Sequence, residues 1–196
     1  PYAAALEAQK SGKVLHIGVT SHKLQAAKTL VEFDKFETIQ FPLNFLEPEG
    51  LKELFPLAQE KEMGCIVMKP LAGGVIEKAC LAFKYLQQYP NLIPIPGMSD
   101  DKEIKEIVSL YQNKQPLNND ELSEIQLLKK ELGKNFCRRC GYCEPCAQEV
   151  SILVGMSLPR IMKNYGKDYK PGWVVQGAES LDKCIECREC MARCPY

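Results

Sequence analysis

Eight of the ten cysteines in this sequence lie in two closely spaced runs in its last third. The first run comprises Cys137, Cys140, Cys143 and Cys146, and the second comprises Cys184, Cys187, Cys190 and Cys194. Deprotonated thiols at such spacings bind zinc ions or iron–sulfur clusters. The two runs therefore predict a metal centre in residues 136–196.

The second run has the spacing C-x2-C-x2-C-x3-C-P, because Pro195 follows Cys194. This is the pattern of bacterial ferredoxins, in which the fourth cysteine of each run binds the other of two [4Fe–4S] clusters. By this rule, we assign one cluster to Cys194 and the first three cysteines of the first run. The second cluster is assigned to Cys146 and the first three cysteines of the second run. Cys146 departs from the pattern, because its run is one residue short and Ala147 replaces the proline.

Zinc is the alternative to iron–sulfur clusters, since two CxxC pairs could form a zinc ribbon with four thiolates. A zinc ribbon does not require a triply repeated spacing that ends in Cys-Pro, so the pattern favours the clusters. Four arginines among the cysteines could offset the negative charge of the clusters or could be ordinary solvated charges: Arg138, Arg139, Arg188 and Arg193. The two remaining cysteines are interpreted as small core residues: Cys65 and Cys80.

Before the cysteine runs, residues 1–100 alternate helix-like and strand-like segments, which predicts βα units and a parallel sheet. We expect strands at 14–19, 38–41, 65–68 and 92–95. A helix at 3–10 precedes them, and further helices are expected at 23–31, 50–61, 77–89 and 100–111. The segment at 14–19 is mostly apolar, with β-branched residues, and predicts a strand buried on both faces. Four βα units suit half of a (β/α)8 barrel or a doubly wound sheet.

The expected organisation has three parts: a barrel region at 1–116, a linking helix within 117–135 and a cysteine-rich domain at 136–196. Asn118, Asn119 and Asp120 can cap the linking helix, which ends at Gly133. In the last part, residues 152–165 are expected to be helical, with Pro159 ending or restarting the helix. Residues 166–180 are expected to form a loop.

In parallel βα folds the chemistry sits at the carboxyl ends of the strands. The four predicted strand ends, at 18–22, 40–44, 68–74 and 95–99, carry hydroxyls, two amides, a lysine and a glycine-containing turn. Such groups suit a ligand with phosphate or amide groups. Taken singly, His22 is more typical of a surface or capping residue, and Gly73-Gly74 of a simple turn.

Taken in order, these segments resemble the aldo-keto reductase family. The family's fifth to eighth barrel strands are similar to GKVLHIGVTSH, TIQFPLNFLE, MKPLAGG and IPIPGMS, and FCRRCGYCEPC is similar to the C-terminal ferredoxin-like extension of some bacterial and archaeal members. The resemblance covers nearly the whole chain. It implies an α/β fold, with the C-terminal half of a TIM (β/α)8 barrel followed by a small, mainly helical ferredoxin-like domain.

The resemblance also implies that NADPH or NADH binds in extended form at the strand ends. The nicotinamide carboxamide would be contacted by Thr20, Ser21 and Gln40. The pyrophosphate would be contacted by Lys69, Pro70, Leu71 and Ala72, and the adenosine side by Gly97, Met98 and Ser99. Two positions depart from the family pattern: Met68 stands where a tyrosine often stacks on the nicotinamide, and Ile107 where an asparagine often contacts the adenine.

The family's catalytic Asp, Tyr, Lys and His lie on its first four strands, to which no segment of this chain corresponds. We therefore expect the sequence to be a C-terminal fragment, which begins at Pro1 within a helix, and assign it no catalytic residue. The function implied for the parent is NAD(P)H-dependent reduction of a small carbonyl substrate, with electron transfer through the clusters to a partner such as ferredoxin or flavodoxin. The alternative is a non-catalytic electron-transfer or scaffold module that binds two [4Fe–4S] clusters.

Charge and hydropathy argue against two classes of partner. The 25 Lys and Arg balance the 25 Asp and Glu, so nothing predicts binding to nucleic acid or an anionic membrane. No apolar run is long enough to span a bilayer. Clustered CxxC spacing indicates metal binding in a reducing compartment, so we expect a cytoplasmic protein.

Overall fold

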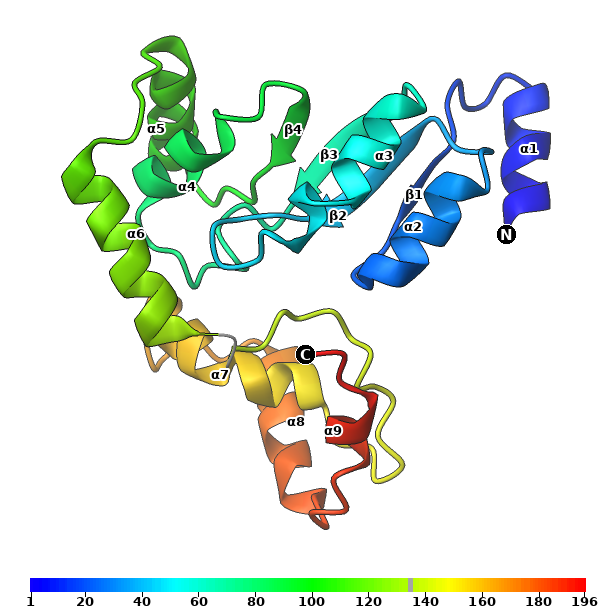
Figure 1. The fold of residues 1–196 in the computed structure, drawn as a ribbon. Helices are drawn as coiled ribbons and strands as arrows, with labels where there is room; N and C mark the ends of the chain where they lie inside the picture. The colour runs from blue at the N-terminus through cyan, green and yellow to red at the C-terminus, as the bar shows by residue number, and fades with distance from the viewer. Residues whose placement is uncertain (134–135) are drawn as a thin grey trace. The chain divides into compact units, whose positions relative to one another are not determined.

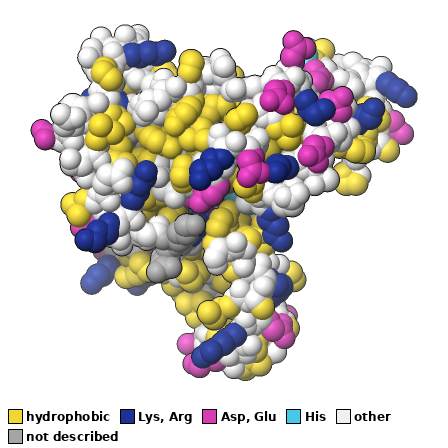
Figure 2. All heavy atoms as spheres, viewed as in Figure 1, with side chains coloured by type: hydrophobic (Ala, Val, Ile, Leu, Met, Phe, Trp, Pro, Cys, Tyr) yellow, Lys and Arg dark blue, Asp and Glu magenta, His cyan; other side chains and the backbone are white. Residues whose placement is uncertain are grey.

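A computed structural model describes residues 1–133 and 136–196 (Figure 1). The chain divides into two compact units, Pro1–Phe136 and Cys137–Tyr196. Residues 134–135, which end the segment expected to hold a linking helix, lie outside the described residues. On the face in Figure 2, Lys and Arg side chains are interspersed with Asp and Glu, in keeping with the balanced composition.

The first unit is built on one parallel sheet, as expected. Its strands are β1 (Gly18–Thr20), β2 (Thr38–Pro42), β3 (Gly64–Met68) and β4 (Leu92–Ile95), in the order β1-β2-β3-β4. Each strand pairs in parallel with the next one along the chain. Parallel neighbours require crossover connections, and helices supply them here.

The helices of the first unit precede, connect and follow these strands. They are α1 (Tyr2–Lys10), α2 (Leu24–Glu32), the 3-10 helix η1 (Glu49–Leu51), α3 (Leu54–Glu60), α4 (Ala79–Leu86), α5 (Asp101–Gln112) and α6 (Asn119–Leu132). Asn118 and Glu121 form a capping box at the start of α6, so this helix begins near the expected position. Within the described ranges, no helix combines the length and apolarity that crossing a membrane would require.

Two expectations for this unit are wrong. The first strand spans only Gly18–Thr20, and Leu15 is 78% exposed rather than buried. Pairing with β2 starts at Thr38, so the residues before Gly18 have no strand opposite them. The single helix expected at 50–61 is split into η1 and α3. Pro56 explains the break, because proline cannot donate a backbone hydrogen bond one turn back to Lys52.

Two apolar clusters hold the first unit together. One lies between the sheet and helices α2 and α3, and includes Val31, Ile39, Phe41 and Phe55. The other cluster joins the loops after β2 and β3 to α4 and α6, and its buried residues are Phe45, Leu46, Ala72, Ile76, Leu81, Ala82 and Ile125. Burying a side chain such as Phe45 stabilises the fold by about 2–3 kcal/mol. The second cluster therefore fixes the loops at the strand ends.

The second unit is helical, with α7 (Ile152–Tyr165), α8 (Gly172–Glu179), the 3-10 helix η2 (Ser180–Lys183) and α9 (Glu189–Arg193). Two expectations are corrected here. Pro159 lies inside α7 without ending it, and α8 occupies part of the expected loop at 166–180. The helix α8 packs on α7, where Gly177 lies directly against Val154. This contact outweighs the poor helix propensity of the segment.

Candidate functional site

The strand ends in the first unit meet along one edge of the sheet. The register pairs Thr20 with Gln40, and Met68 with both Pro42 and Ile95. The backbone N–H of Ser21 donates to the carbonyl of Gln40 at 3.2 Å. Because all four strands are parallel and in chain order, their carboxyl ends lie side by side (Figure 1). The structure thus brings Thr20, Ser21 and Gln40 together.

The Ser21 side chain is engaged in a local turn. It is 7% exposed, and its hydroxyl donates to the carbonyl of Lys23 and accepts from the N–H of Lys23, both at 3.1 Å. These bonds form the turn that leads into α2. If the Ser21 hydroxyl also bound a nicotinamide, it would make that hydrogen bond in addition to, or in place of, its bonds within the turn.

The loop after β3 is a tight turn. Its backbone has positive φ at Lys69 (55°) and Ala72 (49°), and at Gly73 and Gly74. Three backbone hydrogen bonds close the turn. The N–H of Ala72 donates to the carbonyl of Lys69 at 2.9 Å, and the N–H groups of Gly74 and Ile76 donate to the carbonyl of Leu71 at 2.8 and 3.2 Å. Turns with successive left-handed residues form concave surfaces that accept anions. The predicted pyrophosphate residues Lys69, Pro70, Leu71 and Ala72 therefore lie on a preorganised turn.

Asn44 connects this turn to the loop after β2. It is 1% exposed, and its side-chain amide donates to the carbonyl of Lys69 at 3.1 Å and to the carboxylate of Glu47 at 3.0 Å. Its side-chain oxygen accepts from the N–H groups of Leu46 and Glu47, at 2.9 and 3.1 Å. Sequence reasoning counted Asn44 among the polar groups at the strand ends, but it assigned no role to Glu47 and did not predict the contact between Asn44 and Lys69. The signal was a pair of polar residues within the otherwise apolar segment at 41–48.

His22 is partly buried near Lys69. Burial is the main cause that lowers its pKa to about 4, and the positive charge of Lys69 lowers the pKa further. The imidazole is therefore neutral at pH 7, and Lys69 carries the positive charge at this end of the sheet. His22 has no catalytic assignment here.

The predicted adenosine contacts occupy an open segment. Gly97, Met98 and Ser99 are all exposed, and a Cβ atom at Gly97 would meet nothing within 4 Å. Asp100 caps α5 by accepting from the N–H groups of Lys102 and Glu103, both at 2.9 Å. The structure thus places these residues in the exposed segment between β4 and α5.

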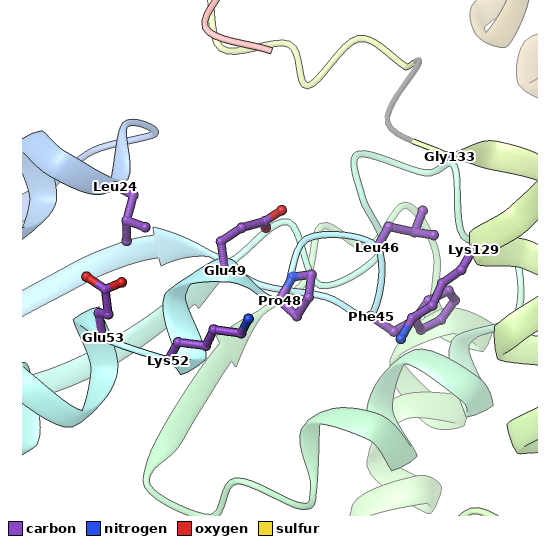
Figure 3. A pocket seen from close by; sticks show the side chains of 9 residues that line it. All are labelled: Leu24, Phe45, Leu46, Pro48, Glu49, Lys52, Glu53, Lys129 and Gly133. Atoms are coloured by element: carbon purple, nitrogen blue, oxygen red, sulfur yellow. The ribbon is translucent and has the colours of Figure 1, made fainter.

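A hollow of 560 Å³ lies in the first unit (Figure 3), lined by Leu24, Phe45, Leu46, Pro48, Glu49, Lys52, Glu53, Lys129 and Gly133. In Figure 3 the side chains of Leu24 and Glu53 lie at one end, and those of Leu46 and Lys129 at the other. None of the residues predicted to contact NAD(P)H lines this hollow. It shares only the loop after β2 with the strand-end site.

In the second unit, the first three cysteines of the first run lie near one another. Burial is the main cause that raises the pKa of the Cys143 thiol, and the negative charges of Glu144, Cys137 and Cys140 raise it further. The N–H of Arg139 donates to Sγ of Cys137 at 3.4 Å. Positive φ at Arg139 and Gly141 turns the backbone between the cysteines. Such a loop can wrap one side of a cluster, with backbone N–H groups donating to sulfur.

The second run follows η2 and includes α9. Cys184 comes directly after η2, Cys190 lies in α9, and Cys194 follows α9. Glu186 and Arg188 have positive φ of 55° and 62°, so this loop also turns sharply between its cysteines. No three His, Cys, Asp or Glu side chains in the described part of the chain are arranged to hold a metal ion.

Contacts between neighbours of the cysteines join the two runs. Nη1 of Arg193 donates to the carbonyl of Pro145 at 2.8 Å, and Nζ of Lys183 lies 3.2 Å from the carboxylate of Glu149. The guanidinium carbon of Arg138 lies 4.5 Å from the ring centroid of Tyr196. Residues next to the start of each run thus lie near residues at the end of the other. The eight cysteines of the two runs are free thiols, and thiols are the donor groups that iron–sulfur clusters require.

Comparison with protein-family models finds a match in the first part of the chain and another in the last part. Residues 2–81 match the aldo/keto reductase family, and residues 136–196 match the 4Fe-4S dicluster domain. One segment of the chain is therefore similar to the aldo/keto reductase family and another to the 4Fe–4S dicluster domain, which confirms the resemblance recognised from its motifs. No curated protein matches the chain.

Solved structures with a similar fold are also aldo-keto reductases. The holo form of an aldo-keto reductase from Bacillus halodurans is 20% identical, with a TM-score of 0.50 over 62% of this chain and 52% of its own. Aldose reductase from Giardia lamblia is 15% identical, with a TM-score of 0.52 over 66% of this chain and 50% of its own. The chain thus spans about half the length of these structures. At such identities the likeness is one of fold, that of a partial TIM barrel.

Proposed function

We propose that this chain is part of an iron–sulfur oxidoreductase that uses NADPH or NADH to reduce a small carbonyl substrate. Its two [4Fe–4S] clusters would exchange single electrons with a partner such as ferredoxin or flavodoxin. The observation that carries the proposal is that one chain holds both a row of parallel strand ends and eight free cysteines in two closely spaced runs. When bound, the dinucleotide supplies a hydride and the clusters supply single electrons.

At the strand ends, each group of residues would bind one part of the dinucleotide. Thr20 and Gln40 are neighbours in register, so they could both donate to or accept from a carboxamide. The turn at 69–72 is held in place by Asn44, and Lys69 would offset the charge of a pyrophosphate. Because His22 is neutral at pH 7, this positive charge depends on Lys69.

Catalysis would need residues outside this chain. The family's Asp, Tyr, Lys and His belong to strands that precede the four seen here, and Lys69 and His22 do not replace them. We therefore infer that the 196 residues alone do not reduce carbonyl compounds. The dinucleotide contacts and the crossed ligation are both parts of the proposal.

The cluster part is tested by purifying the chain without oxygen and measuring iron, sulfide and zinc. We expect brown protein with about eight irons per chain, the number that two clusters require. Zinc at one or two ions per chain with little iron would refute this part. Crossed ligation predicts that Cys146→Ser removes the same electron paramagnetic resonance signal as Cys184→Ser. If Cys146→Ser instead removes the signal lost in Cys137→Ser, the crossing is wrong.

The reductase part is tested by oxidation of NADPH with a panel of aldehydes and ketones. The chain extended by its upstream coding sequence should oxidise NADPH, whereas residues 1–196 should not. An extended protein whose clusters exchange electrons with ferredoxin, but which never oxidises NADPH or NADH, would support the electron-transfer module instead. Turnover by residues 1–196 alone would refute the assignment of catalysis to preceding strands.

A further inference from the structure

We propose that Arg138 and Tyr196 form a clamp that holds Cys194 beside the first cysteine run and so positions the fourth ligand of the first cluster. The inference rests on the proposed clusters and adds two positioning residues to them. Neither residue is itself a metal ligand in this proposal.

The contact between the two side chains is close, and one of them is buried. The guanidinium carbon of Arg138 lies 4.5 Å from the ring centroid of Tyr196, well within the range of a cation–π interaction. Arg138 is only 6% exposed, although arginine is rarely buried without a partner. The guanidinium is therefore largely removed from water, where attraction to an aromatic face is strongest.

The place of both residues in the sequence links the contact to the cysteines. Arg138 directly follows Cys137, and Tyr196 is two residues after Cys194. Between Cys194 and Tyr196, Pro195 fixes one backbone dihedral, so the position of the tyrosine ring limits where the Cys194 thiol can lie. The clamp thus joins the two cysteines that crossed ligation assigns to opposite ends of one cluster.

A second contact holds the other side of Cys194. Arg193 precedes it, and Nη1 of Arg193 donates to the carbonyl of Pro145 at 2.8 Å. Cys194 is therefore held from both sides, by Arg193 toward the end of the first run and by Tyr196 toward its start. A long segment separates the two runs, so bringing Cys194 to the first run costs loop-closure entropy. The contacts of Arg193 and Tyr196 offset that cost.

The clamp also places positive charge next to the first cluster. Four thiolates give an oxidised cluster a net negative charge, and a neighbouring guanidinium favours it. Arg188, in the second run, differs from Arg138 in its burial. It is exposed, and among the described residues no aromatic ring lies over it. Loss of the clamp should therefore affect the first cluster and spare the second.

The test compares Tyr196→Leu with Tyr196→Phe, which keeps the aromatic face. Each protein is purified without oxygen, and iron per chain, loss of iron to a chelator and the spectrum of each reduced cluster are measured. In Tyr196→Leu we expect about four of the eight irons to leave about tenfold faster, with the signal of the second cluster unchanged. Tyr196→Phe should match the wild type, as should the exposed control Arg188→Gln.

Arg138→Gln is the second variant, and it should show the same selective loss with the ring intact. Circular dichroism confirms that each variant retains its helices. Wild-type retention of both clusters in Tyr196→Leu and Arg138→Gln would overturn the clamp, and so would equal loss of both clusters from a helical protein. A wild-type chain without iron would overturn the proposed clusters themselves, which separates the two failures.

Discussion

At the scale of single residues, Asn44 has the most connections at the strand ends. Its side chain makes four hydrogen bonds, to Leu46, Glu47 and Lys69, while almost completely buried. A buried amide that uses both its donor and acceptor atoms stabilises one loop conformation over others. Asn44 therefore fixes the turn proposed for phosphate binding relative to the end of β2.

Replacing this side chain should destabilise the first unit. In Asn44→Ala, the N–H of Leu46 loses its side-chain acceptor and the buried Glu47 carboxylate loses a donor, while the N–H of Glu47 keeps only the backbone carbonyl of residue 44 as acceptor. We expect a loss of about 2–4 kcal/mol in the free energy of unfolding, measured by urea denaturation. The control is Asn113→Ala, an exposed asparagine, which should change stability by less than about 0.5 kcal/mol. Equal urea-denaturation midpoints for Asn44→Ala and Asn113→Ala would show that the hydrogen bonds of Asn44 do not stabilise the first unit.

His22 should make stability depend on pH. Its pKa is lowered from 6.5 to about 4 in the folded chain, so the unfolded chain binds more protons between these values. Stability contributed by His22 is therefore complete above about pH 6.5 and is lost as pH falls toward 4. Because the ring is only partly buried, we expect about 1 kcal/mol of this loss by pH 5.

The measurement is the difference in urea unfolding free energy between pH 7 and pH 5. It should be smaller in His22→Gln than in the wild type, because glutamine does not titrate. The cysteine-rich unit responds to acid equally in both proteins, so the comparison isolates His22. Identical pH dependence in the two proteins would show that this histidine is not desolvated.

At the scale of elements, the sequence predicted those elements that carry their own signals. Strands β2, β3 and β4 lie where β-branched runs predict them, and Asn118 marks the start of α6. The shortness of β1 and the presence of α8 depend on neighbours distant in the chain, β2 and Val154. The hydrogen bond from Asn44 to Lys69 was missed for the same reason, because the two residues lie on different loops. Local pattern cannot report such contacts.

The packing of α8 on α7 depends on the absence of a side chain at Gly177. A Cβ atom there would lie 2.5 Å from Cγ1 of Val154 and 2.7 Å from its Cβ. Gly177→Ala should therefore lower stability by about 1–3 kcal/mol, although alanine favours helix more than glycine does. Thermal unfolding followed by circular dichroism would measure the change.

Gly172 is the matched control for this substitution. It lies in the same helix, and a Cβ atom at this position would meet nothing within 4 Å. Gly172→Ala should leave the unfolding temperature unchanged or raise it slightly. A Gly177→Ala protein as stable as Gly172→Ala would mean that α8 does not pack on Val154.

At the scale of the whole molecule, the two halves were predicted from different kinds of signal. The cysteine spacing alone indicates a two-cluster domain, because cluster chemistry restricts both residue type and interval. The barrel half was recognised only from four motifs in order, since each strand end is uninformative by itself. How Arg138 and Tyr196 join the two runs follows from tertiary packing, and spacing says nothing of it.

The sheet also exposes apolar side chains that a complete barrel would cover. Within the described residues, β1 and β4 each pair with one neighbour only, and Ile93 and Ile95 on β4 are 62% and 45% exposed. Pro94 has no N–H to donate, so pairing along the edge of β4 is disfavoured. We infer that contact between chains would be made by the isoleucine side chains rather than by backbone pairing.

These residues therefore predict self-association of the 196-residue chain. Size-exclusion chromatography with light scattering should show a mass that rises with protein concentration, because exposed apolar patches associate. Ile93→Lys places a charge on the patch and should shift the protein toward monomer. Val108→Lys, on the exposed face of α5 at 47% exposure, introduces the same charge elsewhere and should not. If the wild type stays monomeric at every concentration, or if both lysine variants act alike, the exposed face of β4 is not the surface through which the chain associates.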